Sequence, residues 1–261
     1  MSQESAPETP DAGCGIADVA IEPECSPVIG GPGLHRPADY WAALGAARRV
    51  TEVIQARQTR ADVAFDRWLP EELRDRSLEY WTPLPVLARV ADWLRETQAR
   101  TVVDIGSGAG KFCVAAALLT SCRFIGLEQR ASLVDMARAL ATLFDVADRV
   151  TFLTGDFGAL PTPQADAYYL YNPFGEYDFD SDRYAELGVR FNDETLKRDL
   201  FAMSYLLALA PAGTLVITYN GFGGPLPRSY EEIAVDVRFP CALRLWRKRG
   251  WGAGSAGVRT A

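Results

Sequence analysis

The stretch "VVDIGSGAGKF", from Val102 to Phe112, decides the fold class, because it runs from a short apolar strand through a glycine-rich turn into a helix. Gly106, Gly108 and Gly110 stand directly after the strand and directly before the helical residues. Glycines at this point of a doubly wound sheet let the backbone approach a nucleotide-like ligand closely. The stretch therefore predicts a ligand-binding turn at the carboxyl end of a strand.

The spacing of these glycines separates two kinds of nucleotide site. The dinucleotide fingerprint G-x-G-x-x-G would need a glycine at position 111, where this chain has Lys111. The chain reads G-x-G-x-G instead, and the acid Asp104 precedes it. A phosphate-binding P-loop is excluded as well, because no Gly-Lys-Ser/Thr follows the glycines at the required spacing.

The segments around the turn predict an α/β architecture. Short apolar runs rich in β-branched and aromatic residues alternate with helical stretches; they read "TVVDIG", "RFIGLE", "VTFLTGD", "AYYLYN" and "TLVITYN". This alternation is typical of a doubly wound, mostly parallel sheet with helices on both faces. Two more strand-like runs, "YEEIAVDVRF" and "CALRLWRKR", are joined by Pro240 without a helix. They predict a C-terminal antiparallel hairpin and bring the sheet to seven strands.

The domain organisation follows from changes in composition along the chain. Residues 1–34 contain no Lys or Arg and many small and acidic residues, so they are predicted to be a disordered or loosely packed arm. Residues 35–79 are predicted to form a helical cap, residues 80–249 the ligand-binding domain, and residues 250–261 a flexible tail. Within the domain, the first helix is predicted to be capped by Thr82.

Composition limits the function classes. The 261 residues are 48% hydrophobic and carry a net charge of -7, which argues against a surface built for nucleic acid. No apolar run approaches the roughly 18 residues that a membrane helix needs. The five cysteines are scattered without metal-site spacing, so we expect no metal and a reducing, cytoplasmic compartment. The sequence makes no prediction of the oligomeric state.

Two further acids strengthen the reading of the glycine turn. Glu128 ends the second strand about twenty residues beyond the glycines, and Asp156 ends the third strand. With Asp104, these residues make the sequence resemble the class I S-adenosylmethionine-dependent methyltransferases, whose first motif is an acid followed by G-x-G-x-G. The resemblance covers roughly residues 80–247. It implies a Rossmann-like fold, S-adenosylmethionine (SAM) as cofactor and S-adenosylhomocysteine (SAH) as product.

The resemblance also implies roles for single residues on the cofactor side. Glu128 would accept hydrogen bonds from both ribose hydroxyls of the cofactor. Asp156 would accept one from the adenine amino group, and Phe157 would cover the adenine ring. Asp104 would lie near the methionine amino group or order the glycine turn.

The fourth strand ends in "LYNPF", where Asn172, Pro173 and Phe174 resemble a shortened N-P-P-F/Y motif of methyltransferases that modify amines or amides. In those enzymes the Asn side chain holds the target nitrogen, and the aromatic ring packs against the substrate. The second proline of the motif is missing here. The sequence also resembles uncharacterised bacterial methyltransferases in which "LYNPF" is followed by a Tyr-x-Asn-type turn, approximated here by "TYNGF".

These motifs predict an acceptor side at the ends of the fourth and fifth strands. The candidate substrate-binding residues beyond the "NPF" motif are Tyr171, Glu176, Tyr219, Asn220, Tyr80 and Trp81. Glu176 belongs to an acidic loop that would favour a cationic acceptor. Tyr80 and Trp81 lie at the junction with the cap, where they would line the pocket or anchor the core.

The sequence therefore predicts a SAM-dependent methyltransferase that acts on nitrogen in a small molecule or a protein side chain. Two alternatives stay open: an O-methyltransferase of a small molecule, and a SAM-binding regulatory module without turnover.

Overall fold

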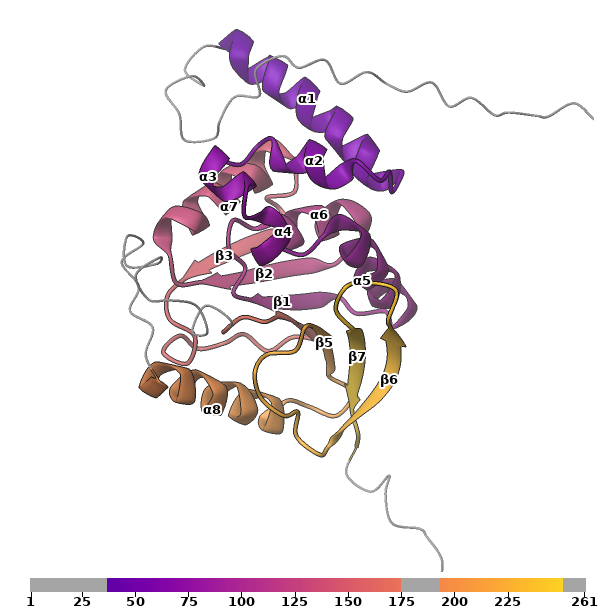
Figure 1. Ribbon diagram of the computed structural model, residues 1–261, viewed down its shortest axis with the longest axis vertical. Helices are drawn as coiled ribbons and strands as arrows, with labels where there is room; N and C mark the ends of the chain where they lie inside the picture. The colour runs from indigo at the N-terminus through magenta and orange to yellow at the C-terminus, as the bar shows by residue number, and fades with distance from the viewer. Residues whose placement is uncertain (1–36, 175–192, 251–261) are drawn as a thin grey trace, which may run out of the picture.

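The computed structural model describes residues 37–174 and 193–250 (Figure 1). Its helices are α1 Pro37–Gln55, α2 Ala61–Asp66, α3 Glu71–Arg74, α4 Ser77–Tyr80, α5 Leu84–Glu96, α6 Lys111–Leu119, α7 Ala131–Leu143 and α8 Asp193–Leu209. Its strands are β1 Thr101–Ile105, β2 Arg123–Glu128, β3 Val150–Thr154, β4 Ala167–Tyr171, β5 Leu215–Tyr219, β6 Tyr230–Asp236 and β7 Leu243–Lys248.

The strands form one sheet of seven in the order β3-β2-β1-β4-β5-β7-β6. Strands β1 to β5 are parallel, whereas β7 runs antiparallel to both β5 and β6. The predicted seven-stranded, mostly parallel sheet with a C-terminal antiparallel hairpin is confirmed. Because chain order reverses on either side of β1, the carboxyl ends of β1 and β4 flank a topological switch point, where open α/β sheets bind their ligands.

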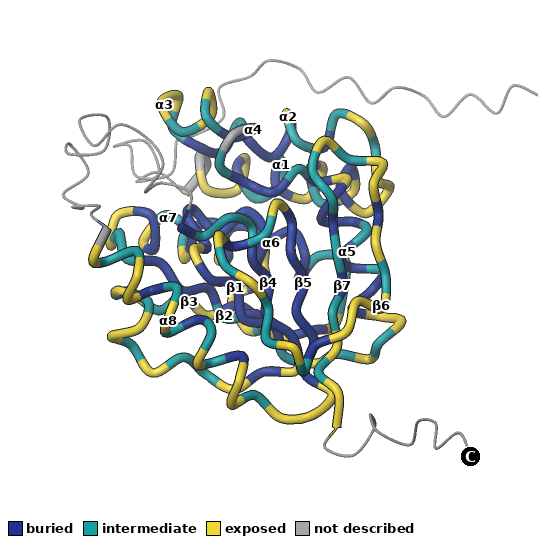
Figure 2. The backbone as a smooth tube through the Cα atoms, turned by 60° about the horizontal axis from the view of Figure 1, so that its bottom comes forward, coloured by how far each residue is buried: buried dark blue, intermediate teal, exposed yellow. Residues whose placement is uncertain are grey.

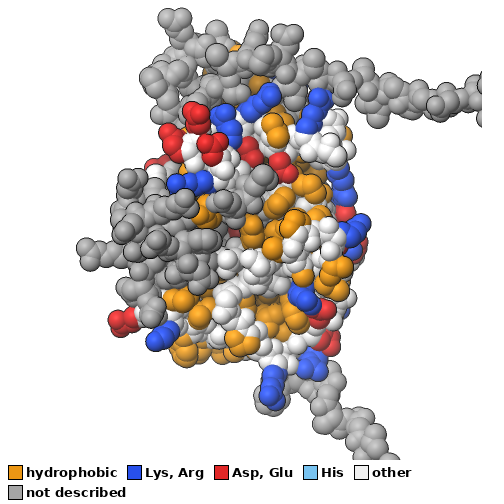
Figure 3. Space-filling model, in the orientation of Figure 1, with side chains coloured by type: hydrophobic (Ala, Val, Ile, Leu, Met, Phe, Trp, Pro, Cys, Tyr) orange, Lys and Arg blue, Asp and Glu red, His pale blue; other side chains and the backbone are white. Residues whose placement is uncertain are grey.

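The two faces of the sheet are covered unequally. One face packs against α5, α6, α7 and the helices of the cap in a single large apolar cluster. On the other face, α8 contributes Met203 and Leu207 to a smaller cluster (Figures 1 and 2). The described connections 155–166 and 220–229 contain no helix. The α8 side leaves apolar residues exposed: Phe201, Tyr205 and Leu209 are 72%, 59% and 65% accessible (Figure 3).

The start of α5 corrects one prediction. Thr82 does not cap this helix, which begins at Leu84 after Pro83 and has no side-chain cap. The Thr82 hydroxyl instead lies 2.7 Å from the Tyr169 hydroxyl of β4. The Leu84 N–H is satisfied by the carboxylate of Asp62 at 2.9 Å. A carboxylate that is distant in sequence thus takes the place of an N-cap side chain at α5 and links α2 to this helix. The contact between Thr82 and Tyr169 links the same junction to the sheet.

Several predictions lie outside the described residues, namely the arm at 1–34, the acidic loop with Glu176, and the tail beyond Gly250. Within residues 37–174 and 193–250, none of the helices combines the length and apolarity required to cross a bilayer. The helices α1, α2 and α3 fall inside the predicted cap and share their apolar core with α6 and α7, whereas α4 ends at Tyr80, the first residue of the predicted domain.

Candidate cofactor and acceptor site

The glycine turn between β1 and α6 adopts a backbone conformation that favours glycine. Gly106, Gly108 and Gly110 have φ angles of +79°, +53° and +82°. In this left-handed region a Cβ atom costs free energy, so glycine is the residue that fits. The N–H groups of Gly106 and Ser107 both donate to the carbonyl of Leu127 at 2.9 Å. The turn is therefore fastened to the end of β2.

Side chains from distant segments pack directly on this turn. A Cβ atom on Gly108 would lie 2.4 Å from Nε1 of Trp81, closer than any real contact allows. A Cβ atom on Gly106 would lie 3.3 Å from Cβ of Pro173. The junction of the cap and the "NPF" turn after β4 thus both touch the glycine turn. The structure brings together the predicted cofactor and acceptor motifs.

Glu128 is the buried acceptor at the end of β2. Its Oε2 accepts a hydrogen bond from the Gly108 N–H at 3.0 Å. Its Oε1 accepts from the Arg130 backbone N–H at 2.9 Å and from Arg130 Nε at 2.8 Å, and Arg130 Nη2 lies 3.4 Å from Oε2. A carboxylate offers about four acceptor positions. Two ribose hydroxyls would therefore compete with the Arg130 side chain, whose Nη2 contact is the longest of the four.

Asp104 lies beneath the glycine turn and is 4% accessible. Its Oδ2 accepts a hydrogen bond from the Cys113 thiol of α6 at 3.4 Å. Burial raises the pKa of Asp104 from 3.8 to about 7, the Cys113 hydrogen bond lowers it, and the neighbouring charge of Glu128 raises it. The charge of Glu128 therefore opposes the ionisation of Asp104.

The third predicted acid, Asp156, follows β3 and is exposed. Phe157 beside it is half-buried, and its ring centroid lies 5.7 Å from that of Phe174. Phe174 is 6% accessible and belongs to the apolar cluster on the α8 face. The residues predicted to cover adenine and to shape the acceptor pocket therefore meet each other at the edge of the sheet.

The ends of β4 and β5 carry the predicted acceptor residues Asn172 and Asn220. Their φ angles are +41° and +60°, a conformation in which Asn is enriched among residues with side chains. The Asn172 N–H donates to the carbonyl of Gly221 at 3.0 Å. The two turns are thus held side by side, with Pro173 of the first resting on Gly106 of the glycine turn.

A pair of tyrosines lies just before these turns. The rings of Tyr171 and Tyr219 are 4.8 Å apart at an angle of 47°. Burial raises the pKa of Tyr171 to about 12, and burial also raises the pKa of Tyr219. The Cys241 thiol is close enough to raise both pKa values further. These hydroxyls are neutral at physiological pH and act as hydrogen-bonding groups.

A pocket of about 460 Å³ opens beside Asn220. It is lined by the loop at 220–226, the β6–β7 turn at 240–242, and the side chains of Thr218, Arg244 and Trp246. Trp246 Nε1 donates to Thr218 Oγ1 at 3.2 Å, which fixes the indole in the wall. The volume falls in the range of small-molecule sites, about 300–1,000 Å³.

The residues of the predicted cap junction take different positions. Trp81 is 9% accessible and covers the glycine turn, whereas Tyr80 at the end of α4 is partly exposed. Sequence reasoning missed Cys113, Arg130 and Lys111 as neighbours of the site. Lys111 carried a signal, because it is the one charge at the start of an otherwise apolar helix, "KFCVAAALL".

Residues 96–223 match a family model described as a methyltransferase domain. The match spans just under half of the chain and includes the glycine turn, the acids of β2 and β3, and the "NPF" turn. The curated proteins contain no significant match to the sequence.

Solved structures similar to this chain include three methyltransferases. An RNA methyltransferase from Salinibacter ruber in complex with SAH has 23% identity over 64% of this chain and 93% of its own, with a TM-score of 0.46. An O-methyltransferase from Bacillus cereus in complex with SAH has 14% identity over 78% and 91%, with a TM-score of 0.45. A mitomycin 7-O-methyltransferase has 18% identity over 82% and 69%, with a TM-score of 0.46.

The matched domain, with its glycine turn and ordered acids, defines the enzyme class. The protein is a SAM-dependent methyltransferase, and SAM is its cofactor. The donor set fits this cofactor, since a buried carboxylate ends β2 and an exposed carboxylate follows β3, where they would accept hydrogen bonds from the ribose and the adenine. When bound, SAM supplies a methyl group activated by its sulfonium.

Proposed function

We propose that this methyltransferase acts on a nitrogen atom of its acceptor. The proposal rests on the "NPF" turn, which places Pro173 against Gly106 and holds Asn172 next to Gly221 at the mouth of β4 and β5. An Asn amide oxygen accepts a hydrogen bond from an N–H group, which aligns the nitrogen lone pair for transfer. Alignment of this kind is a main source of catalysis for an activated donor.

The described side chains around Asn172 favour a neutral acceptor atom. The hydroxyls of Tyr171 and Tyr219 stay protonated at neutral pH, because burial raises their pKa values, so they do not supply a general base. The acceptor nitrogen would therefore enter unprotonated and release its proton to water after transfer. Asn172 holds the nitrogen, and the tyrosines add ring surface and hydrogen bonds beside it.

The pocket beside Asn220 supports a small-molecule acceptor. It begins at the turn that contacts Asn172 and continues along aromatic and aliphatic side chains, which suit a partly apolar molecule. A protein side chain that enters the same pocket would satisfy the same contacts. The free thiols of Cys113, Cys122 and Cys241 are consistent with a reducing, cytoplasmic compartment.

The test is incubation of the enzyme with labelled SAM and a cell extract that is then fractionated by size. We expect label in the small-molecule fraction, and mass spectrometry should place it on nitrogen. The N172A enzyme is the control, because it should bind cofactor and transfer little label. Label on oxygen would overturn the proposal, and cofactor binding without any transfer would indicate a regulatory module.

A further inference from the structure

Lys111 is the first residue of α6, directly after the glycine turn, and its side chain is buried at 1% accessibility. A cation at a helix N-terminus opposes the helix dipole. Burial of an ammonium group adds a large desolvation cost unless it is paired. The rest of the helix is apolar, so packing alone would be served by an apolar residue. The lysine therefore has a specific partner to bind.

Within the part of the chain that the structure describes, the polar partners of Lys111 come from α2 and α4. The Lys111 ammonium lies 2.8 Å from Asp62 Oδ1 and 2.8 Å from Asp66 Oδ1, both of α2. It also donates to Ser77 Oγ of α4 at 3.0 Å. The contact with Asp66 is an ion pair. Burial raises the pKa of the Asp66 carboxyl, and the positive charge of Lys111 lowers it.

The segment between these contacts carries Trp81. Ser77 holds the start of α4 to Lys111, and Thr82 holds the next residues to Tyr169 of β4 at 2.7 Å. Asp62 binds the Leu84 N–H as well as Lys111. Trp81 lies between these fixed points with its indole on Gly108. Gly108 in turn donates its N–H to Glu128.

We propose that Lys111 is a positioning residue for the cofactor: its buried ammonium fastens α2 and α4 to the glycine turn, seats Trp81 on Gly108 and makes the cap one wall of the SAM site. The inference rests on the assignment of SAM as cofactor. Where a dinucleotide site has a third glycine that packs the helix on the strand, this chain uses a lysine that reaches into the cap. Cofactor affinity thus depends on cap residues remote in sequence.

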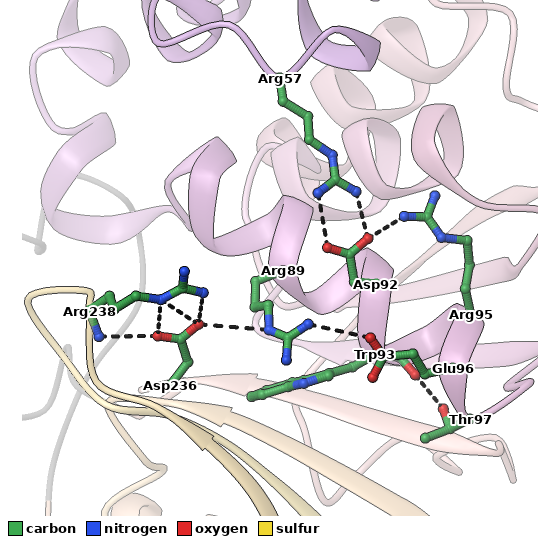
Figure 4. Close-up of polar contacts among 9 residues, drawn as sticks. All are labelled: Arg57, Arg89, Asp92, Trp93, Arg95, Glu96, Thr97, Asp236 and Arg238. Carbon is green, nitrogen blue, oxygen red and sulfur yellow. Dashed lines mark hydrogen bonds and ion pairs between the residues drawn. The ribbon is translucent and has the colours of Figure 1, made fainter.

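A second ion-pair contact between the cap and the domain provides a matched control for the substitution of Lys111. Arg57, after α1, donates to Asp92 of α5 through Nη1 at 2.9 Å and Nη2 at 2.5 Å, and Arg95 pairs with the same carboxylate (Figure 4). This tie joins the cap to α5. No contact in the described chain links Asp92 to the glycine turn. Loss of the Asp92 charge should loosen the cap and leave the cofactor site intact.

The experiment measures the SAH dissociation constant by isothermal titration, together with Tm, for the wild type and for K111M, D66N and D92N. We expect K111M to weaken SAH binding at least tenfold and D66N about threefold, since D66N keeps the Asp62 and Ser77 contacts. D92N should lower Tm while its dissociation constant stays within twofold of the wild type. If K111M does not fold, the SAH dissociation constants of D66N and D92N are compared instead, and only D66N should bind SAH more weakly than the wild type.

A double-mutant cycle with W81L tests the route of the effect. If Lys111 acts through Trp81, K111M should weaken SAH binding less than threefold in the W81L background. If the effects of K111M and W81L on SAH affinity are fully additive, the coupling between the two residues is refuted. If K111M or D66N lowers Tm as D92N does but leaves SAH affinity unchanged, the positioning role of Lys111 is refuted. A wild type that binds no SAH would instead refute the cofactor assignment, so the two failures are distinguishable.

Discussion

The carboxyl edge of the sheet has two halves with opposite electrostatic character. At β1 and β2 the candidate site residues are the buried carboxyls of Asp104 and Glu128. At β4 and β5 they are neutral, the amide of Asn172 and the hydroxyls of Tyr171 and Tyr219. The first half is suited to fix a polar, charged cofactor, and the second to hold an uncharged acceptor atom. The two halves touch where Pro173 lies on Gly106. Because their candidate side chains differ in charge and in the ligand that they would bind, mutations should affect the two halves separately.

The largest effect should come from the charged half. E128A removes the carboxylate that is predicted to accept both ribose hydroxyls, and hydrogen bonds to charged groups contribute about 1.5–3 kcal/mol each. We expect the SAH dissociation constant to rise about 100-fold in titration calorimetry. D135N, which changes an exposed carboxylate of α7 with 76% side-chain accessibility, should leave affinity unchanged. An E128A enzyme with affinity within threefold of the wild type would refute this role of Glu128.

Asn172 should show the opposite pattern in the neutral half. N172A should lower kcat/KM roughly 10- to 100-fold with the identified acceptor, since it removes one preorganised hydrogen bond. SAH affinity should stay within twofold. N172G is the control for the positive φ angle, because glycine adopts it without strain. If N172G restores the activity that N172A loses, the backbone and not the side chain carries the function.

Asp104 should make the stability of the charged half pH-dependent. Its pKa is raised from 3.8 to about 7, so its protonated form contributes stability that is fully present below about pH 4 and is lost as the pH rises through 7. D104N does not titrate. We expect D104N to raise Tm at pH 8 relative to the wild type, by about 2–4 °C for each kcal/mol gained.

The same comparison at pH 5 is the control for Asp104. There the gain in Tm should shrink, because the wild-type carboxyl is already largely protonated. An equal gain at both pH values would show that the carboxyl is not titrating in this range.

The smallest effect should come from Tyr219. Y219F removes a hydroxyl that hydrogen-bonds the Cys241 backbone and stays neutral at physiological pH. We expect a loss of about 1 kcal/mol or less in the free energy of unfolding by urea denaturation. SAH affinity should not change. A large loss of SAH affinity in Y219F would place this tyrosine in the cofactor half and remove the proposed division.

Local patterns predicted the fold around the charged half. The strand–glycine–helix order, the spacing to Glu128 and the alternation of strands and helices all depend on residues close in sequence, and the structure confirms the fold. The strand bounds differ from the predicted runs by a few residues at most. Parallel strands place their carboxyl ends on one edge of the sheet, so the sequence alone predicted that the acids at the strand ends lie along the same edge.

Contacts across long sequence distances could not be predicted in the same way. Trp81 packs on Gly108, and Thr82 binds Tyr169 in place of capping α5. Nothing in the local sequence of Thr82 signals this partner, since a threonine before a helix is also typical of a cap. Lys111 was recognised only as a missing glycine, although a lone charge at the start of an apolar helix indicates a buried ion pair.

The division of the carboxyl edge is tested most directly by titrating SAH into the wild type, E128A and N172A under identical conditions. We expect the wild type and N172A to bind with dissociation constants within twofold of each other, and E128A to bind about 100-fold more weakly. Equal weakening in both variants, or unchanged binding in E128A, would contradict this division.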